Sequence, residues 1–277
     1  MIKKFFISSC LLLSIVSFSQ EGTSSPYSFY GIGETRFNGT VESRSMGGIS
    51  MIPDSTRINF QNPAGYGNIK WTNFTIGAST SRTKQKSGTS DATAKRTTLD
   101  YLALAIPMGK FGAGFGLIPY SSVGYKIENV YPDGSQNNKR FNGWGGMNRV
   151  FLGTGYRILP NLSVGASAYY NFGKIQTNSL EFIPFVPVGS RELNVNELNG
   201  VNFNFGLMHQ FKLKDKLSVF SSLYYTPKST LTSNNERTIG TVAYNSNYDL
   251  SEVDSYDPVN TKTELQMPQK WALGLGI

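Results

Sequence analysis

Cysteine and histidine are almost absent from this chain of 277 residues, which carries one of each, Cys10 and His209. Cys10 lies inside an expected export signal, so the mature chain would contain no disulfide and no thiol-based site. A single histidine without cysteine also leaves a zinc centre short of its usual ligands. We therefore expect neither a metal nor a cofactor.

Long hydrophobic runs are missing as well. The longest mainly apolar stretch covers residues 5–18 and follows two lysines. It is shorter than the roughly 20 residues that a membrane-spanning helix needs. A basic start, a short apolar core and small residues before Gln20 are typical of a secretory signal peptide, which we assign to residues 1–19.

Charged residues make up only 16% of the chain, and their formal balance is +8. The lysines and arginines are scattered, for example through residues 82–96, and do not form one dense patch. Contact with anionic lipid head groups or simple solvation explains this distribution better than nucleic-acid binding. We expect no nucleic-acid partner.

What the chain does contain is strand-like alternation, seen best in residues 162–172. Leu162, Val164 and Tyr170 fall on one face of such a strand, and Ser163 and Asn171 fall on the other. A soluble sandwich would alternate too, but an export signal and alternating short and long connections favour an outer-membrane β-barrel. The expected fold class is therefore all-β, a transmembrane antiparallel β-barrel in the bacterial (Gram-negative) outer membrane.

The turns divide residues 70–277 into about nine expected strands. Short turns are predicted at 108–110, 160–161 and 214–216, and long loops at 82–96, 125–146, 175–198 and 229–262. Bacterial single-chain barrels have even strand numbers, so we expect a barrel truncated in mid-barrel, as in an N-terminal fragment. A miscounted barrel of eight strands is the alternative.

Residues 20–69 lack clean alternation and are expected to form an irregular N-terminal segment. Within them, a glycine pair, an aspartate and an Asn-Pro-Ala motif follow in order: Gly47, Gly48, Asp54, Asn62, Pro63 and Ala64. This order resembles the N-terminal signature of the FadL family of outer-membrane transporters for hydrophobic compounds. The glycine-alternating strand at 111–119 and the segment 265–276 also look like parts of that family.

The resemblance implies a barrel plugged by an N-terminal hatch, here residues 20–69. It also implies a channel for hydrophobic small molecules such as long-chain fatty acids or other lipids, which bind an internal apolar pocket. Four apolar residues in a predicted loop are candidate ligand contacts, since exposed apolar patches usually mark contact sites: Phe182, Ile183, Phe185 and Val186.

Three other functions were weighed. The first alternative is a non-transporting FadL-like barrel that serves as partner or accessory of an envelope or secretion complex. The second is a general porin, which the small, polar and aromatic lumen residues disfavour. The third is a lipid-facing enzyme built on His209, but no catalytic motif surrounds that residue. We therefore expect no enzymatic activity.

Overall fold

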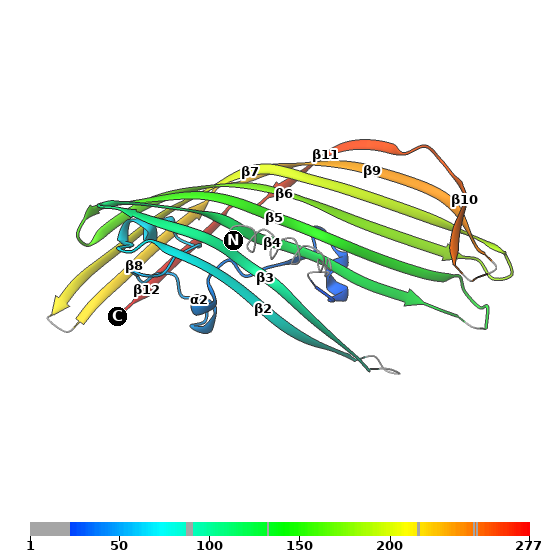
Figure 1. The fold of residues 1–277 in the computed structure, drawn as a ribbon, viewed down its shortest axis with the longest axis horizontal. Coiled ribbons are helices and arrows are strands. Elements are labelled where there is room, and N and C mark those ends of the chain that lie inside the picture. The colour runs from blue at the N-terminus through cyan, green and yellow to red at the C-terminus, as the bar shows by residue number, and fades with distance from the viewer. Residues whose placement is uncertain (1–22, 87–90, 132, 215–216, 246, 248) are drawn as a thin grey trace, which may run out of the picture.

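The computed structural model describes residues 23–86, 91–131, 133–214, 217–245, 247 and 249–277, so the expected signal peptide lies outside the described residues. The chain is mainly β-structure, with three short helices ahead of the long strands (Figure 1). The elements are, in order, η1 (Pro26–Phe29), β1 (Glu34–Thr35), α2 (Val41–Ser45), η2 (Pro63–Asn68), β2 (Asn73–Lys86), β3 (Asp91–Met108), β4 (Phe111–Asn129), β5 (Asn138–Leu159), β6 (Leu162–Phe182), β7 (Val188–Lys214), β8 (Leu217–Thr226), β9 (Ser229–Tyr244), β10 (Leu250–Ser255), β11 (Val259–Met267) and β12 (Lys270–Gly276).

The strands form one antiparallel sheet in which neighbours along the chain are mostly neighbours in space. One side of β7 pairs with β6, and its other side pairs first with β9 and then with β8. β8 and β9 thus act as two halves of one long strand, interrupted at Pro227, which cannot donate a ladder hydrogen bond. β12 and β11 pair with these two halves in turn.

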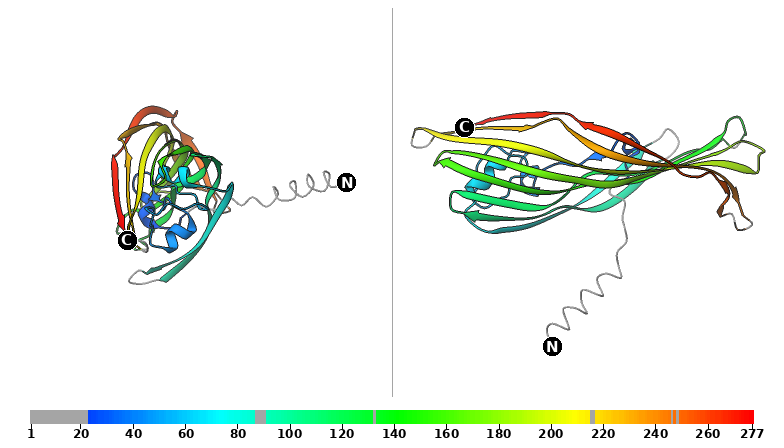
Figure 2. Two further views of the ribbon diagram at one scale, coloured as in Figure 1. Left: turned by 90° about the vertical axis from the view of Figure 1, so that its left-hand side faces the viewer. Right: turned by 90° about the horizontal axis from the view of Figure 1, so that it is seen from above.

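The expectation of a closed barrel is not met. Among the described residues, β2 pairs only with β3 and β12 pairs only with β8, so the sheet has two open edges. The sheet is nevertheless strongly curved and wraps around the N-terminal segment in the end-on view (Figure 2). The structure shows a curved, open antiparallel sheet, and truncation in mid-barrel stays a prediction.

The two faces of the sheet differ as the alternation predicted. On β6, Ser163, Ser167 and Asn171 are buried, whereas Tyr170 on the opposite face is 52% exposed. On β7, Asn204 is buried, and Phe203 beside it is 51% exposed. We call the buried, mostly small and polar side the inner face and the apolar side the outer face.

The strand lengths differ most from expectation. We predicted long loops at 125–146, 175–198 and 229–262, but most of these residues continue the strands and stay paired across the sheet. β7 has 27 residues, or about 90 Å at ~3.3 Å per residue, whereas a barrel strand crosses a bilayer in about 9–11. The extensions escaped prediction because their apolar residues, such as Ile175 and Leu198, lie among many polar ones, which obscures the alternation but does not prevent the hydrogen bonds.

Short turns and longer connections do separate to opposite ends, as predicted. The β3–β4 and β5–β6 turns lie at one end of the sheet, and the connections β4–β5, β6–β7 and β9–β10 lie at the other (Figure 1). We call the end with the connections β4–β5, β6–β7 and β9–β10 the distal end. Cross-strand ion pairs stabilise the sheet near it, such as Arg140–Glu128 at 2.9 Å and Lys139–Glu181 at 3.2 Å.

The core lies on the inner face. Ile58, Phe60 and Tyr66 of the N-terminal segment pack with Tyr101 and Phe151 of the sheet, and a second cluster around Met147 and Leu231 lies beside it. In the part of the chain that the structure describes, no helix is long and apolar enough to cross a membrane.

Candidate functional site on the inner face and at the distal end

Six glycines of four neighbouring strands form a seat for the N-terminal segment on the inner face. They belong to β4, β5, β6 and β7 and are Gly112, Gly114, Gly153, Gly155, Gly165 and Gly206. A Cβ on Gly112 would overlap the Tyr66 carbonyl oxygen, and one on Gly165 would overlap the Pro63 backbone. These positions need glycine because the backbone of η2 lies directly on the strands. We call them the glycine seat.

Asn62 joins the segment to the seat by hydrogen bonds. Its Oδ1 accepts the Ala64 N–H at 3.1 Å and so caps η2, where Pro63 occupies the first turn. Its Nδ2 donates to the carbonyl oxygens of Leu207 at 3.2 Å and Leu223 at 3.3 Å. Asn62 is fully buried, so these bonds satisfy both ends of an amide that would otherwise be costly to bury.

Tyr66 fills the centre of the seat. Its ring lies against Gly114 and Gly153, and it is only 1% exposed. Burial raises the pKa of its hydroxyl well above the usual value. Tyr66 therefore acts as a neutral packing residue, and its large aromatic surface holds η2 on the strands.

A buried carboxylate ties the beginning of the N-terminal segment to β3. Asp100 lies 3.6 Å from Arg36 Nη1 and 3.3 Å from Arg44 Nη1, and it also accepts a hydrogen bond from Ser79. Arg36 additionally donates to Thr98 at 2.7 Å. Two cations from the segment thus converge on one acid of the sheet.

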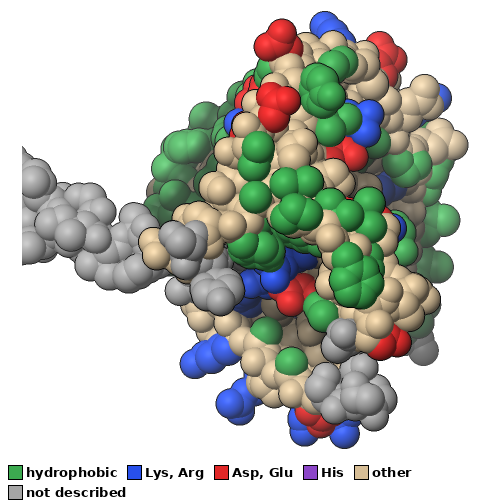
Figure 3. Space-filling model, turned by 90° about the vertical axis from the view of Figure 1, so that its right-hand side faces the viewer, with side chains coloured by type: hydrophobic (Ala, Val, Ile, Leu, Met, Phe, Trp, Pro, Cys, Tyr) green, Lys and Arg blue, Asp and Glu red, His purple; other side chains and the backbone are tan. Residues whose placement is uncertain are grey.

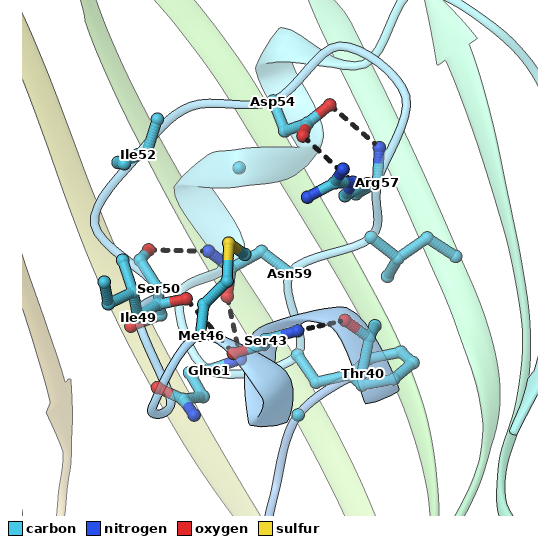
Figure 4. A pocket seen from close by; sticks show the side chains of 14 residues that line it. Thr40, Ser43, Met46, Ile49, Ser50, Ile52, Asp54, Arg57, Asn59 and Gln61 are labelled. Atoms are coloured by element: carbon cyan, nitrogen blue, oxygen red, sulfur yellow. Dashed lines mark hydrogen bonds and ion pairs between the residues drawn. The ribbon is translucent and has the colours of Figure 1, made fainter. Parts of the chain in front are cut away.

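Gly47, Gly48 and Asp54 lie apart from the seat, in the loop after α2. Both glycines have positive φ, and the Gly48 N–H donates to the Ser43 carbonyl at 2.7 Å, which ends the helix. Asp54 accepts from the Thr56 N–H at 2.7 Å and pairs with Arg57 (Figure 4). These residues build turns, and Asp54 lines a small cavity of about 140 Å³.

Partial burial acts to raise the pKa of Asp54, but it is outweighed. Hydrogen bonds from the Thr56 N–H and hydroxyl, together with the charge and N–H of Arg57, hold that pKa below its usual value. Asp54 is therefore a charged turn residue near neutral pH. Nothing about its surroundings suits it to proton transfer at that pH.

The four apolar loop residues lie together at the β6–β7 connection. Phe182 stacks on Tyr244 of β9, with ring centroids 5.2 Å apart, whereas Phe185 is fully exposed and has a φ of 63°. A positive φ is unfavourable for phenylalanine and is typical of strained, functional positions. Figure 3 views this end, where apolar side chains lie among charged ones. We call Phe182, Ile183, Phe185 and Val186 the distal patch.

The single histidine lies at the edge of the sheet's turn region. His209 faces Asn161 at 3.3 Å and stacks on Phe211, next to the β5–β6 turn. Within the described ranges, no three His, Cys, Asp or Glu residues are placed to hold a metal ion.

Sequence reasoning brought some residues of the seat together and missed others. Asn62, Pro63 and Ala64 meet at the seat, whereas Gly47 and Gly48 belong to a different turn. Whether the segment plugs a pore, as a hatch would, stays a prediction. Arg149 was overlooked, although its place on the small-residue face of its strand was a readable signal of an inward-pointing charge.

Comparison with known proteins changes the functional interpretation. No curated protein and no solved structure matches the chain. A family model, BamG, matches residues 1–277, which overturns the resemblance to the FadL transporters. The expected channel for fatty acids or other hydrophobic molecules was therefore wrong, because the residues behind it were short motifs that the whole-chain comparison outweighs. By that match over its full length, the chain belongs to the BamG family.

Proposed function

We propose that this protein is an accessory component of the outer-membrane β-barrel assembly machinery and acts by binding protein partners in the cell envelope. The observation that carries the proposal is the BamG family match over residues 1–277. It corresponds to the alternative of a non-transporting accessory barrel and leaves no role for small-molecule uptake.

Two features of the structure support a binding role. On the inner face, the backbone of the N-terminal segment lies directly on the glycine seat, so this face already holds a polypeptide segment. The outer face carries many exposed apolar side chains, for example Phe74 at 67% and Leu152 at 64%. Contiguous exposed apolar surface of this kind suits a lipid or protein environment better than water.

The distal patch is the surface that we assign to a protein partner. Phe185 is fully exposed and Ile183 is 54% exposed, and a cavity of about 400 Å³ lies beside them. Aromatic anchors next to a recess are typical of the centre of a protein interface. Charged residues such as Lys139 and Arg140 also line this recess, as at the polar rim of an interface.

Membership of the machinery is tested by purification from the native host in mild detergent. The tagged chain should recover the central barrel-forming subunit of the machinery in fixed stoichiometry, and its depletion should lower the level of assembled outer-membrane barrel proteins. Purification without any subunit of the machinery, together with unchanged barrel levels after depletion, would overturn the proposal.

The distal patch is tested by replacing Ile183 and Phe185 with serine. We expect recovery of the central subunit to fall at least several-fold, because interface energy is concentrated in such anchors. The matched control is Tyr27→Ser on η1, which removes an aromatic side chain that is 84% exposed. If the variant with serine at both positions and Tyr27→Ser recover equal amounts of the central subunit, the contact lies elsewhere.

A further inference from the structure

A second cavity lies between the N-terminal segment and the inner face, in the middle of the sheet. Its volume is about 320 Å³, and β4 to β9, β11 and β12 contribute to it together with residues 35–38 and Gln61. The lining residues that matter here are Tyr120, Arg149, Tyr169, Asn204, Tyr224 and Lys270. None of the described residues that line this cavity is Asp or Glu.

Arg149 is the buried cation of this cavity. It is 7% exposed, and its guanidinium carbon lies 3.8 Å from the Tyr120 ring centroid and 5.1 Å from that of Tyr169. Its Nε is buried without a hydrogen-bond partner. Among the residues that the structure describes, no carboxylate lies within ion-pair distance of it.

The nearby acid of the inner face is already engaged. Asp100 pairs with Arg36 and Arg44 and does not line this cavity. Contacts with two tyrosine rings offset only part of the cost of burying a guanidinium. An arginine placed only for packing would not need an adjoining cavity, whereas Arg149 lines one. Two further cations line it, Lys270 and Arg36, of which Arg36 is paired with Asp100.

We propose that this cavity binds a carboxylate of a partner polypeptide, with the guanidinium of Arg149 as its principal contact. The guanidinium presents N–H donors in a planar fork that matches a carboxylate. The tyrosines offer flat surface to the residue that bears the carboxylate, and Asn202 offers an amide group to its backbone.

A polypeptide fits this position better than a lipid head group. The cavity belongs to the inner face, whereas the exposed apolar side chains that suit lipid lie on the outer face of the same strands, such as Phe203 and Phe205 beside Asn204. That the polypeptide belongs to the assembly machinery or its clients rests on the proposed function. The carboxylate site itself rests on the geometry around Arg149.

The test uses two small probes and the full-length chain in detergent. Isothermal titration calorimetry should detect binding of N-acetyl-L-tyrosine and at least tenfold weaker binding of N-acetyl-L-tyrosinamide, which has the same ring but no charge. Arg149→Gln should weaken binding of the acid at least tenfold. Arg237→Gln, on β9 and in an ion pair with Glu192 at 2.9 Å, removes a guanidinium that does not line this cavity and should bind as the unmodified chain does.

Three other outcomes would count against the carboxylate site or its assignment. No binding of the acid, or equal binding of acid and amide to the unmodified chain, would overturn it without any variant, so a folding defect in Arg149→Gln cannot obscure the answer. Inorganic phosphate that competes as strongly as the acid would overturn the assignment to a polypeptide carboxylate. Because neither probe involves the assembly machinery, failure here is distinguishable from failure of the proposed function.

Discussion

Replacement of Gly206 by alanine tests whether the glycine seat holds the N-terminal segment on the sheet. Gly206 lies on β7 beneath Asn62 and Pro63. A Cβ at this position would overlap Asn62 Oδ1 and would lie 2.8 Å from Pro63 Cδ, where ordinary contacts begin at 3.4 Å. The segment would therefore have to retreat from β7.

The retreat would be costly in two ways. Overpacking by one methyl group against unyielding atoms costs about 1–3 kcal/mol. Movement by more than half an ångström would also stretch the bonds from Asn62 Nδ2 to Leu207 and Leu223, now 3.2 and 3.3 Å long, past hydrogen-bond range. Each of the two lost bonds adds about 0.5–1.5 kcal/mol, so we expect a total of roughly 2–6 kcal/mol.

The assay is limited trypsin cleavage of the folded protein in detergent. Arg36, Arg44 and Arg57 all lie in the N-terminal segment, so their cleavage reports its release from the sheet. When opening is fast, the cleavage rate follows the equilibrium population of the open form. A loss of 2 kcal/mol or more should then accelerate cleavage at these sites by roughly tenfold or more, since about 1.4 kcal/mol is one factor of ten.

The matched control is Ala166→Val. Ala166 pairs with Phe205, beside Gly206, and belongs to the outer face of β6, so its added methyl groups do not meet the segment. Cleavage that is unchanged in Gly206→Ala, or accelerated equally in Ala166→Val, would refute the argument that close backbone contact at the seat holds the segment.

Three further changes probe the polar contacts of the segment. Asn62→Ala should cost about 1–3 kcal/mol in urea unfolding, because it uncaps η2 and removes both donors to the strand carbonyls; stability equal to that of the unmodified chain would contradict this. Asp100→Asn should accelerate cleavage after Arg44, which loses its carboxylate partner, while cleavage after exposed lysines of the sheet stays constant. The lowered pKa of Asp54 means that its stabilisation of the turn is complete above its unfolded pKa and is lost as pH falls through the folded pKa. Hydrogen exchange at the Thr56 amide should therefore show extra opening over that acidic range, and Asp54→Asn should abolish the pH dependence.

Comparison of the sequence with the structure separates local from non-local information. Alternation on residues 162–172 correctly predicted which side chains of β6 are buried, because successive side chains of a strand point to opposite faces. Asn62 and Pro63 stood out in the sequence as part of an Asn-Pro-Ala motif, and the cap that they form needs only neighbouring residues. The family was misidentified because the resemblance rested on short motifs, which the match over residues 1–277 outweighs.

The sequence by itself thus determined the strand faces and the tight turns. Only the tertiary structure decided that stretches 125–146 and 175–198 are mostly strand, because ladder hydrogen bonds depend on a distant partner and the many polar residues there obscure the hydrophobic period. It also decided that Asp100 pairs with Arg36 and Arg44 while Arg149 lies between two tyrosines. Those arrangements join residues many positions apart, and the curvature of the sheet, not the order of the chain, brings them together.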